Sequence, residues 1–237
     1  MQLFYAPELQ GDHYTLSEQE SKHCLKVLRM HTGDQVMLTD GIGGMYTGQL
    51  ANEDHRRCEV KIIRHEKDFG KRNFYLHVAI APTKNINRFE WFLEKTTEIG
   101  IDEITPLICM RSERRAVKTE RLEKVIIAAM KQSIKAYHPI LNGQMDFKTY
   151  VSAKREGEKY IAYVEEGDHP PLQTLCKPGQ HTTILIGPEG DFSPEEVRMA
   201  TENGYSTASL GKSRLRTETA GIVACHTLAL INEGKKR

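Results

Sequence analysis

The residues best suited to do chemistry lie in two loops near the end of the chain, residues 186–191 and 210–220. Among their charged residues are two glutamates, Glu189 and Glu218, and the cation Arg216. A carboxylate can accept a proton, and an arginine can stabilise an anion that forms during a reaction. Both loops also contain glycine, which lets a backbone bend sharply or approach a ligand closely. Two interpretations are open: ligand-binding loops that carry reactive groups, or tight turns followed by an acid that the helix dipole favours.

The elements that must position these loops can be recognised on both sides of them. Residues 183–186 are a short apolar, β-branched run, which is typical of a buried strand. After the first loop, Ser193, Pro194 and Glu196 form an N-cap, a first helical position and a capping box. The second loop leads into residues 219–231, which are apolar on almost every side and predict a helix buried in a core or an oligomer interface. Two such turns place both loops outside the carboxyl ends of neighbouring strands, where open α/β sheets bind ligands.

Two familiar nucleotide-binding motifs can be set aside. Residues 211–213 (Gly-Lys-Ser) look like the end of a phosphate-binding P-loop, but Ser206 stands where that motif needs a glycine. The glycine cluster that begins at Gly41 fails as a dinucleotide-binding fingerprint because Tyr46 replaces its last glycine. The sequence therefore predicts neither a P-loop NTPase nor a standard Rossmann dinucleotide site.

The rest of the chain divides into two parts with different secondary-structure patterns. Its first part has short alternating runs and turn signals, which predict a small β-barrel or sheet, together with one helix at 17–30. Residues 66–73 are charged and contain glycine, as linkers often do. Beyond them strand and helix patterns alternate, as in a mostly parallel sheet. The predicted domains are residues 1–70 and 73–237.

Basic residues gather most densely at 111–121. One interpretation is phosphate contact, because cations displace counterions from RNA; the other is an ordinary solvated charge run. Arg88, Trp91 and Lys95 share one face of a predicted helix at 88–99, where they could clamp and stack an RNA strand or lie at the edge of the core.

Overall composition limits the class of protein. The net charge of the 237 residues is only +1, so any surface that binds nucleic acid must be local. The five cysteines are scattered and form no Cys-x-x-Cys pair, which argues against a disulfide framework and a structural zinc site. The longest apolar run, near residue 222, is too short for a membrane span. We expect a cytoplasmic protein with no membrane segment and no metal.

The two loops resemble the signature loops of a known family. Residues 186–196 have the pattern Ile-Gly-Pro-Glu-Gly-x-Phe-Ser-x-x-Glu, and residues 210–220 the pattern Leu-Gly-x-x-x-Leu-Arg-Thr-Glu-Thr-Ala. These patterns are similar to those of the RsmE family, SPOUT-type methyltransferases that act on N3 of a uridine in bacterial 16S ribosomal RNA. The resemblance covers the whole chain. It implies an α/β fold in which a small β-rich, PUA-like barrel domain that binds RNA precedes a trefoil-knotted methyltransferase domain.

The resemblance also implies partners and roles for residues. S-adenosylmethionine is the expected cofactor, a homodimer the expected assembly, and the assembled or assembling 30S subunit the expected substrate. The expected catalytic residues are Arg216, which would stabilise the uracil anion, and Glu218 and Glu189, which would assist proton removal or bind polar groups of the cofactor. The expected cofactor-binding residues are Ile186, Gly187, Pro188, Glu189, Gly190, Leu210, Gly211, Leu215, Arg216, Thr217, Thr219 and Ala220. The expected RNA-binding residues are His23, Arg29, Arg88, Lys95, Arg111, Arg114, Arg115, Lys118, Gln132 and Lys135.

Two positions depart from the family pattern. Leu3 and Lys135 stand where many relatives carry arginine. Leu3 cannot take over a substrate role of the first arginine, and Lys135 keeps the charge of the second but not its bidentate fork. Two alternatives to the predicted function are a non-enzymatic RNA-binding or ribosome-assembly protein on the same fold, and a SPOUT methyltransferase with another RNA target.

Overall fold

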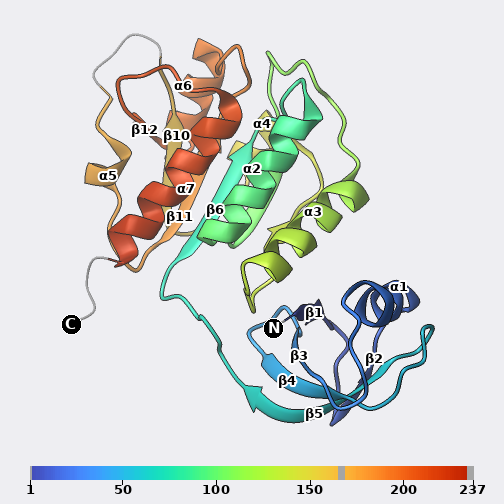
Figure 1. Ribbon diagram of the computed structural model, residues 1–237. Helices are drawn as coiled ribbons and strands as arrows, with labels where there is room; N and C mark the ends of the chain where they lie inside the picture. Colours follow the sequence, from blue (N-terminus) through green and yellow to red (C-terminus); the bar gives the residue numbers. More distant parts are fainter. Residues whose placement is uncertain (1, 165–168, 234–237) are drawn as a thin grey trace. The chain divides into compact units, whose positions relative to one another are not determined.

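The computed structural model describes residues 2–164 and 169–233 of the chain (Figure 1). The chain divides into two compact units. The first comprises Met1–Lys71 and Ile127–His138, and the second Arg72–Ile126 and Pro139–Arg237. Ile127–His138, which lies within the predicted second domain, thus clusters with the first unit. The domain bounds drawn from the sequence stay a prediction.

The first unit is built on a five-stranded sheet in the order β1-β3-β4-β5-β2. Its strands are β1 (Leu3–Tyr5), β2 (His13–Thr15), β3 (Gln35–Thr39), β4 (Met45–Leu50) and β5 (Glu59–Glu66). β1 and β3 pair in parallel, and the other pairs are antiparallel. The side chains of Phe4, Val36, Leu38 and Val60 are fully buried in its core. The prediction of a β-rich first part is confirmed.

The helix expected at 17–30 is shorter and less regular than predicted. It consists of a short α-helix, α1 (Glu18–Lys22), capped by the Ser17 hydroxyl, and a π-helical turn, η1 (His23–Val27). Arg29 adopts a left-handed backbone conformation with φ of 56°, which no α-helix can continue through. The hydrophobic spacing of this segment gave no sign of that turn.

The second unit contains a sheet in the order β12-β10-β11-β6-β7-β8, with β9 also paired to β7. Its strands are β6 (Tyr75–Ile80), β7 (Glu103–Ile108), β8 (Ile140–Leu141), β9 (Met145–Asp146), β10 (Glu158–Ala162), β11 (His181–Ile186) and β12 (Ser206–Ala208). These strands pair in parallel. The helices of the unit are α2 (Ile86–Ile99), α3 (Thr119–Gln132), which runs on into the first unit, α4 (Phe147–Ser152), α5 (Leu172–Leu175), α6 (Pro194–Glu202) and α7 (Thr217–Glu233). The predicted α/β class is confirmed, and the trefoil knot stays a prediction.

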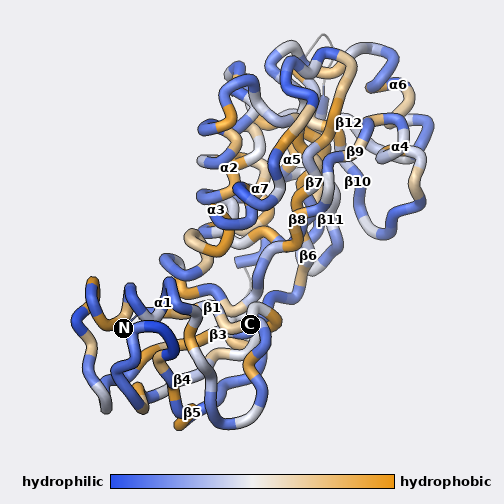
Figure 2. Tube along the Cα trace, turned by 90° about the vertical axis from the view of Figure 1, so that its right-hand side faces the viewer, coloured by the Kyte–Doolittle hydropathy of each residue, from blue (hydrophilic) through white to orange (hydrophobic). Residues whose placement is uncertain are grey.

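Helices cover both faces of this parallel sheet. α2 and α7 lie on one face, where Phe89, Phe92 and Leu228 pack against Val78, while α4 and α6 cover the other face (Figure 1). Figure 2 shows hydrophobic residues concentrated along the strands of this unit, as expected for strands that are buried on both faces. The two helix layers cover the faces of the sheet, and the loops lie at the edge formed by the carboxyl ends of the strands.

Gly221 sets the distance between α7 and its neighbours. A Cβ atom added there would lie 2.5 Å from Phe92 Cε2 and 2.9 Å from Ile80 Cδ1. Real Cβ atoms essentially never make contacts that close, so a larger residue would force α7 or the Phe92 and Ile80 side chains to shift. The helix expected at 219–231 is therefore present as α7, and its buried side depends on a glycine.

We expect Gly221→Ala to lower the free energy of unfolding. Alanine gains about 1 kcal/mol in helix propensity over glycine, whereas forcing a methyl group into a packed core costs about 1–3 kcal/mol. The midpoint of urea denaturation should therefore fall while its slope stays constant. Adding Phe92→Leu to Gly221→Ala should recover part of the loss, because the two positions are in contact. An increase in stability with Gly221→Ala alone would contradict the close packing.

Candidate functional site

The carboxyl ends of several strands meet at one edge of the second unit's sheet. Ile186, the last residue of β11, pairs with Ile80 at the end of β6 and with Ala162 at the end of β10. Ala162 in turn pairs with Ala208 at the end of β12. The loops that leave these strands are consequently neighbours, although they are far apart in the sequence. This is the edge at which parallel sheets bind ligands.

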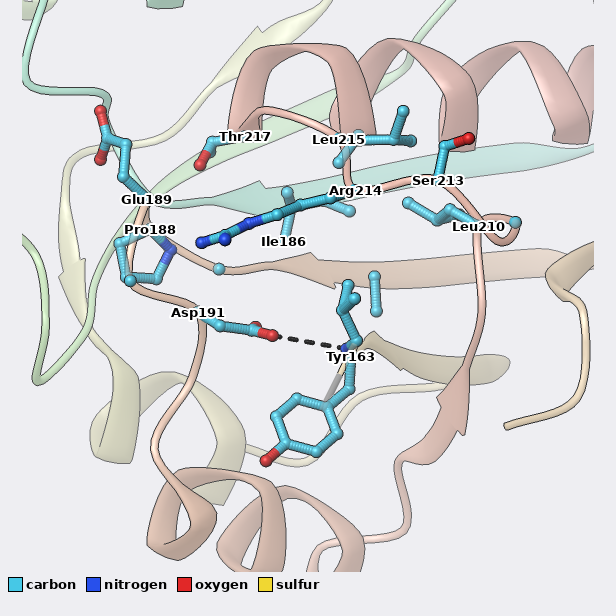
Figure 3. Close-up of a pocket in the computed structure, with 16 residues that line it drawn as sticks. Tyr163, Ile186, Pro188, Glu189, Asp191, Leu210, Ser213, Arg214, Leu215 and Thr217 are labelled. Carbon is cyan, nitrogen blue, oxygen red and sulfur yellow. Dashed lines mark hydrogen bonds between the residues drawn. The ribbon is translucent and has the colours of Figure 1, made fainter. Parts of the chain in front are cut away.

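A cavity of about 350 Å³ opens between these loops (Figure 3). Most of the residues predicted to bind a cofactor line it: Ile186, Gly187, Pro188, Glu189, Gly190, Leu210, Gly211, Leu215, Thr217 and Ala220. Arg216 and Thr219 lie at the start of α7 but do not belong to this lining. The structure thus brings the two predicted loops together around one cavity, and their role in cofactor binding stays a prediction.

Other lining residues were not predicted. Ala162, Tyr163 and Val164 come from the end of β10, and Asp191, Ser213 and Arg214 come from the two loops themselves. The sequence offered a signal for the first group, because the run at 159–164 has a strand pattern whose end would lie on the expected ligand side; Glu165 and Glu166, which follow it, lie outside the described residues. The loop residues gave no comparable signal, because the direction of a loop side chain is set by neighbouring segments.

Asp191 holds the wall of the cavity together. Its backbone has φ of 58°, an uncommon conformation that aspartate tolerates better than most residues. Its Oδ1 accepts the Phe192 N–H at 2.8 Å, and its Oδ2 accepts the Val164 N–H at 3.4 Å (Figure 3). The carboxylate therefore links the loop after β11 to the end of β10.

A second carboxylate, that of Glu196, fixes the start of α6. The Ser193 side chain accepts the Glu196 N–H at 3.2 Å, and Glu196 Oε2 accepts the Ser193 N–H at 2.9 Å, which completes the predicted capping box. Glu196 Oε1 accepts the Met110 N–H at 2.8 Å as well. Since Glu196 is only 7% exposed, the two hydrogen bonds that its carboxylate accepts lie in a poorly solvated region. One buried side chain thus anchors the loop after β11 and the loop after β7.

Two arginines of the 111–121 cluster bind backbone carbonyls near the cavity. Arg111 Nη1 donates to the carbonyl oxygen of Gly190 at 2.7 Å. Arg114 donates from Nε to the carbonyl of Thr83 at 3.0 Å and from Nη2 to that of Lys84 at 2.8 Å. These guanidinium groups brace the loops after β6 and β11, a role that differs from the RNA contact predicted for them.

The predicted catalytic residues occupy three different settings. Glu189 is exposed, its Oε1 accepts the Lys84 N–H at 2.8 Å, and its carboxylate points away from the cavity in Figure 3. Arg216 is exposed, and its carbonyl accepts the Ala220 N–H at 2.8 Å at the start of α7. The side chain of Glu218 is only 7% exposed; its Oε1 lies 3.8 Å from Arg88 Nε, and its Oε2 has no hydrogen-bond partner among the described residues. Of these three residues, Glu189 belongs to the cavity lining, whereas Arg216 and Glu218 do not.

The other predicted RNA-binding residues are divided between the two units. In the second unit, Lys95 lies between Glu94 and Glu98, at 2.7 and 3.0 Å, and Arg115 Nη2 donates to the carbonyl of Met110 at 3.2 Å. Lys118 in the second unit, and Arg29 and Gln132 in the first, are exposed, while His23 and Lys135 in the first unit are half-buried. Whether they contact RNA stays a prediction.

The structure also bears on Leu3, on the cysteines and on the predicted absence of a metal site and a membrane span. Leu3, which replaces a family arginine, is 2% exposed in the core of the first unit, so its side chain contributes to packing. All five cysteines are buried and none of them forms a disulfide bond. In residues 2–164 and 169–233, no cluster of three His, Cys, Asp or Glu side chains could hold a metal ion, and no helix has the length and apolar character that crossing a membrane requires.

We expect Arg114→Lys to weaken the brace while keeping the charge. Lysine cannot reproduce the forked donation to the carbonyls of Thr83 and Lys84. Hydrogen bonds from a charged group contribute about 1.5–3 kcal/mol, and partial exposure reduces this, so a loss of about 1–2 kcal/mol is expected in urea denaturation. Hydrogen exchange should be faster at the Lys84 amide, which depends on the same loop.

Lys118→Ala is the matched control, because it removes a nearby exposed cation and should change stability by less than about 0.5 kcal/mol. If Arg114→Lys behaves like this control, the brace is unimportant for folding.

Comparison with known proteins supports this arrangement. Residues 71–229 match the family model described as an RNA methyltransferase domain, and residues 16–63 match the model described as an RNA methyltransferase PUA domain. The structure of a probable rRNA-methyltransferase from Porphyromonas gingivalis is similar to this chain, with 41% identity, a TM-score of 0.92, and coverage of 98% of this chain and 99% of that one.

Two named relatives are similar over nearly their full length. The ribosomal RNA small subunit methyltransferase E of Neisseria gonorrhoeae, solved bound to S-adenosyl methionine, is 25% identical with a TM-score of 0.90 and 98% coverage of both chains. The ribosomal RNA small subunit methyltransferase E of Rickettsia conorii is 28% identical over 94% of this chain and 89% of the relative. The first-unit match agrees with the PUA-like domain that the sequence predicted.

Proposed function

This chain belongs to the RsmE family of RNA methyltransferases, and from that premise we propose that it methylates N3 of a uridine in 16S ribosomal RNA with S-adenosylmethionine. The expected substrate is the assembled or assembling 30S subunit. The single observation that carries the proposal is the cavity in which both signature loops meet at the carboxyl edge of the sheet. Relatives that match this chain along its length are named as methyltransferases, and one of them was solved with S-adenosyl methionine bound.

The residues around the cavity suit this cofactor. A volume of about 350 Å³ lies in the range of roughly 300–1,000 Å³ that small-molecule sites occupy. The apolar side chains of Ile186, Leu210 and Leu215 can cover an adenine ring, and the backbone around Gly187 and Gly211 can approach it closely. When bound, S-adenosylmethionine supplies an electrophilic methyl group on a positively charged sulfur.

The protein must then prepare the uracil ring. The N3 lone pair becomes available only when the N3 proton leaves, and the resulting anion spreads over the ring oxygens. Correct placement of the base supplies a large part of the rate enhancement, and a positioned proton acceptor typically adds about 10²–10⁴-fold. Two acids are candidates for the acceptor. Glu189 lines the cavity and has its Oε1 bonded to the Lys84 N–H, whereas Glu218 is buried in α7 with Oε2 unpaired among the described residues.

Buried carboxylate oxygens without a partner are costly, so Glu218 is the acid that gains more from a donor supplied by a ligand or another chain. Its ion pair with Arg88 also orients it from α2. We favour Glu218 as the proton acceptor on these grounds, with Glu189 as the alternative.

We further propose a homodimer in the cytoplasm. On α7, Ile222, Val223, His226 and Leu230 share one side of the helix and are partly or fully exposed, with Leu230 54% exposed. An apolar stripe on a helix that is otherwise buried is typical of a subunit interface. We expect the protein in the cytoplasm because ribosomal RNA, its proposed substrate, is found there.

We expect labelled methyl groups to pass from S-adenosylmethionine to small ribosomal subunits taken from a strain that lacks this protein, and nucleoside mass spectrometry to detect 3-methyluridine. Glu218→Gln should lower the rate about 10²–10⁴-fold if Glu218 accepts the proton, with a smaller effect for Glu189→Gln. Glu202→Gln, which changes an exposed acid on α6 away from the cavity, is the matched control.

The possible results separate the proposals. A wild-type protein that binds cofactor and subunits without transferring a methyl group would favour a non-enzymatic RNA-binding protein. Methylation of a different nucleoside would keep the enzyme and replace the target. The reverse order of effects at Glu218 and Glu189 would move the proton acceptor to Glu189.

A further inference from the structure

Arg214 is the cation of the cavity. Among the described residues that line it, Arg214 alone is a lysine or arginine. Figure 3 shows its side chain extending from the second loop across the cavity toward the loop that carries Pro188 and Asp191. Arg216, two residues further on and the cation predicted from the sequence, is not part of the lining. The structure therefore places a different arginine over the site.

The guanidinium of Arg214 has no hydrogen-bond or ion-pair partner within the described part of the chain. This separates it from Arg111 and Arg114, whose guanidinium groups bind backbone carbonyls of the neighbouring loops. Arg88 is likewise paired, with Glu218. Arg214 is thus an arginine beside the cavity whose donors are not used to hold the fold.

Within the described residues, neither acid of the cavity lining forms an ion pair with Arg214. Asp191 uses Oδ1 and Oδ2 to accept backbone N–H groups, and Glu189 accepts the Lys84 N–H with a carboxylate that points away from the cavity. A guanidinium that forms no ion pair with the described residues at a partly enclosed site favours an anionic oxygen, which it can bind with two parallel N–H donors.

The chemistry of the ligands narrows the choice of anion. The sulfonium of the cofactor is positive and would repel the guanidinium. Arg214 is exposed, so it lies on the side of the cavity that solvent, and hence an RNA substrate, can reach. A uracil that has lost its N3 proton carries negative charge on its ring oxygens, which are planar acceptors suited to the arginine fork.

We propose that Arg214, and not Arg216, contacts a ring oxygen of the target uracil and stabilises the anion formed when N3 loses its proton. This inference rests on the proposed function. In the step, the N3 proton passes to a carboxylate and the N3 electron pair forms the bond to the methyl carbon. The bond between that carbon and sulfur breaks, and its electron pair stays on sulfur, which becomes a neutral thioether. Arg214 keeps its protons throughout and donates hydrogen bonds to the uracil oxygen.

The test compares wild type with Arg214→Ala, Arg214→Lys and Arg216→Ala, with Lys212→Ala as the matched control. Lys212 is an exposed cation of the same loop that does not line the cavity. For each protein, kcat and KM for small ribosomal subunits are measured from about pH 6.5 to 9.5, together with S-adenosylhomocysteine affinity by calorimetry and the midpoint of thermal unfolding.

We expect Arg214→Ala to lower kcat about 10²–10³-fold, as removal of a donor to a developing oxyanion does. The deficit should shrink as pH rises, because solvent then removes more of the N3 proton without help from the cation. Arg214→Lys should restore part of kcat, since it keeps the charge without the fork. The affinity of Arg214→Ala for S-adenosylhomocysteine and its midpoint of thermal unfolding should match those of wild type. Lys212→Ala should match wild type in every measurement.

Each other result overturns the assignment in a defined way. A higher KM and a weaker salt dependence at unchanged kcat would show that Arg214 contacts a phosphate. Weaker binding of S-adenosylhomocysteine with unchanged binding of 5′-methylthioadenosine, which lacks the carboxylate, would assign Arg214 to the cofactor. Loss of kcat in Arg216→Ala with normal rates in Arg214→Ala would return the role to Arg216. A wild type that transfers no methyl group would overturn the proposed function itself, whereas an active wild type with an equally active Arg214→Ala would overturn this inference alone.

Discussion

The parallel alignment of β6, β10, β11 and β12 is the constraint on which the site depends. Because Ile80, Ala162, Ile186 and Ala208 lie in register at the ends of these strands, the loops that follow must leave the sheet side by side. Helices on both faces keep the strands buried and prevent them from sliding, since a shift of one residue would turn every side chain to the opposite face. The cavity is a consequence of this register.

Crowding several loops at one edge creates a demand for hydrogen bonds. Loop N–H and C=O groups that are shielded from water need partners, and at this edge side chains provide them. Glu196 binds the N–H groups of Met110 and Ser193, while Arg111 and Arg114 bind carbonyls of the loops after β11 and β6. Acids satisfy donors and arginines satisfy acceptors, so the loops are held by charged side chains from other segments of the chain.

This arrangement changes how the basic residues are interpreted. A run of cations in an almost neutral protein suggests a surface for RNA, yet Arg111 and Arg114 direct their donors inward, to backbone carbonyls. An arginine can brace a loop and still contribute positive potential at the surface, so the two roles do not exclude each other. Arg214 differs because the described residues do not use its donors and because it lines the cavity.

The sequence by itself determined the strand-loop-helix units, the parallel α/β class, the β-rich first part and the two loops that line the cavity. Those features depend on local signals: apolar strand runs, the Ser193 capping box and glycines where the backbone must turn. It also predicted Glu189 and Glu218 as acids of the site, but not that Glu189 is exposed and that Glu218 is buried beside Arg88. Only the tertiary structure showed that the end of β10 forms a third wall of the cavity and that Arg214, not Arg216, lines it. The bracing by Arg111 and Arg114 and the close approach at Gly221 also depend on the tertiary structure. Each of these depends on contacts between segments that are distant in sequence or on the direction of a loop side chain, and the order of residues along a chain encodes neither directly.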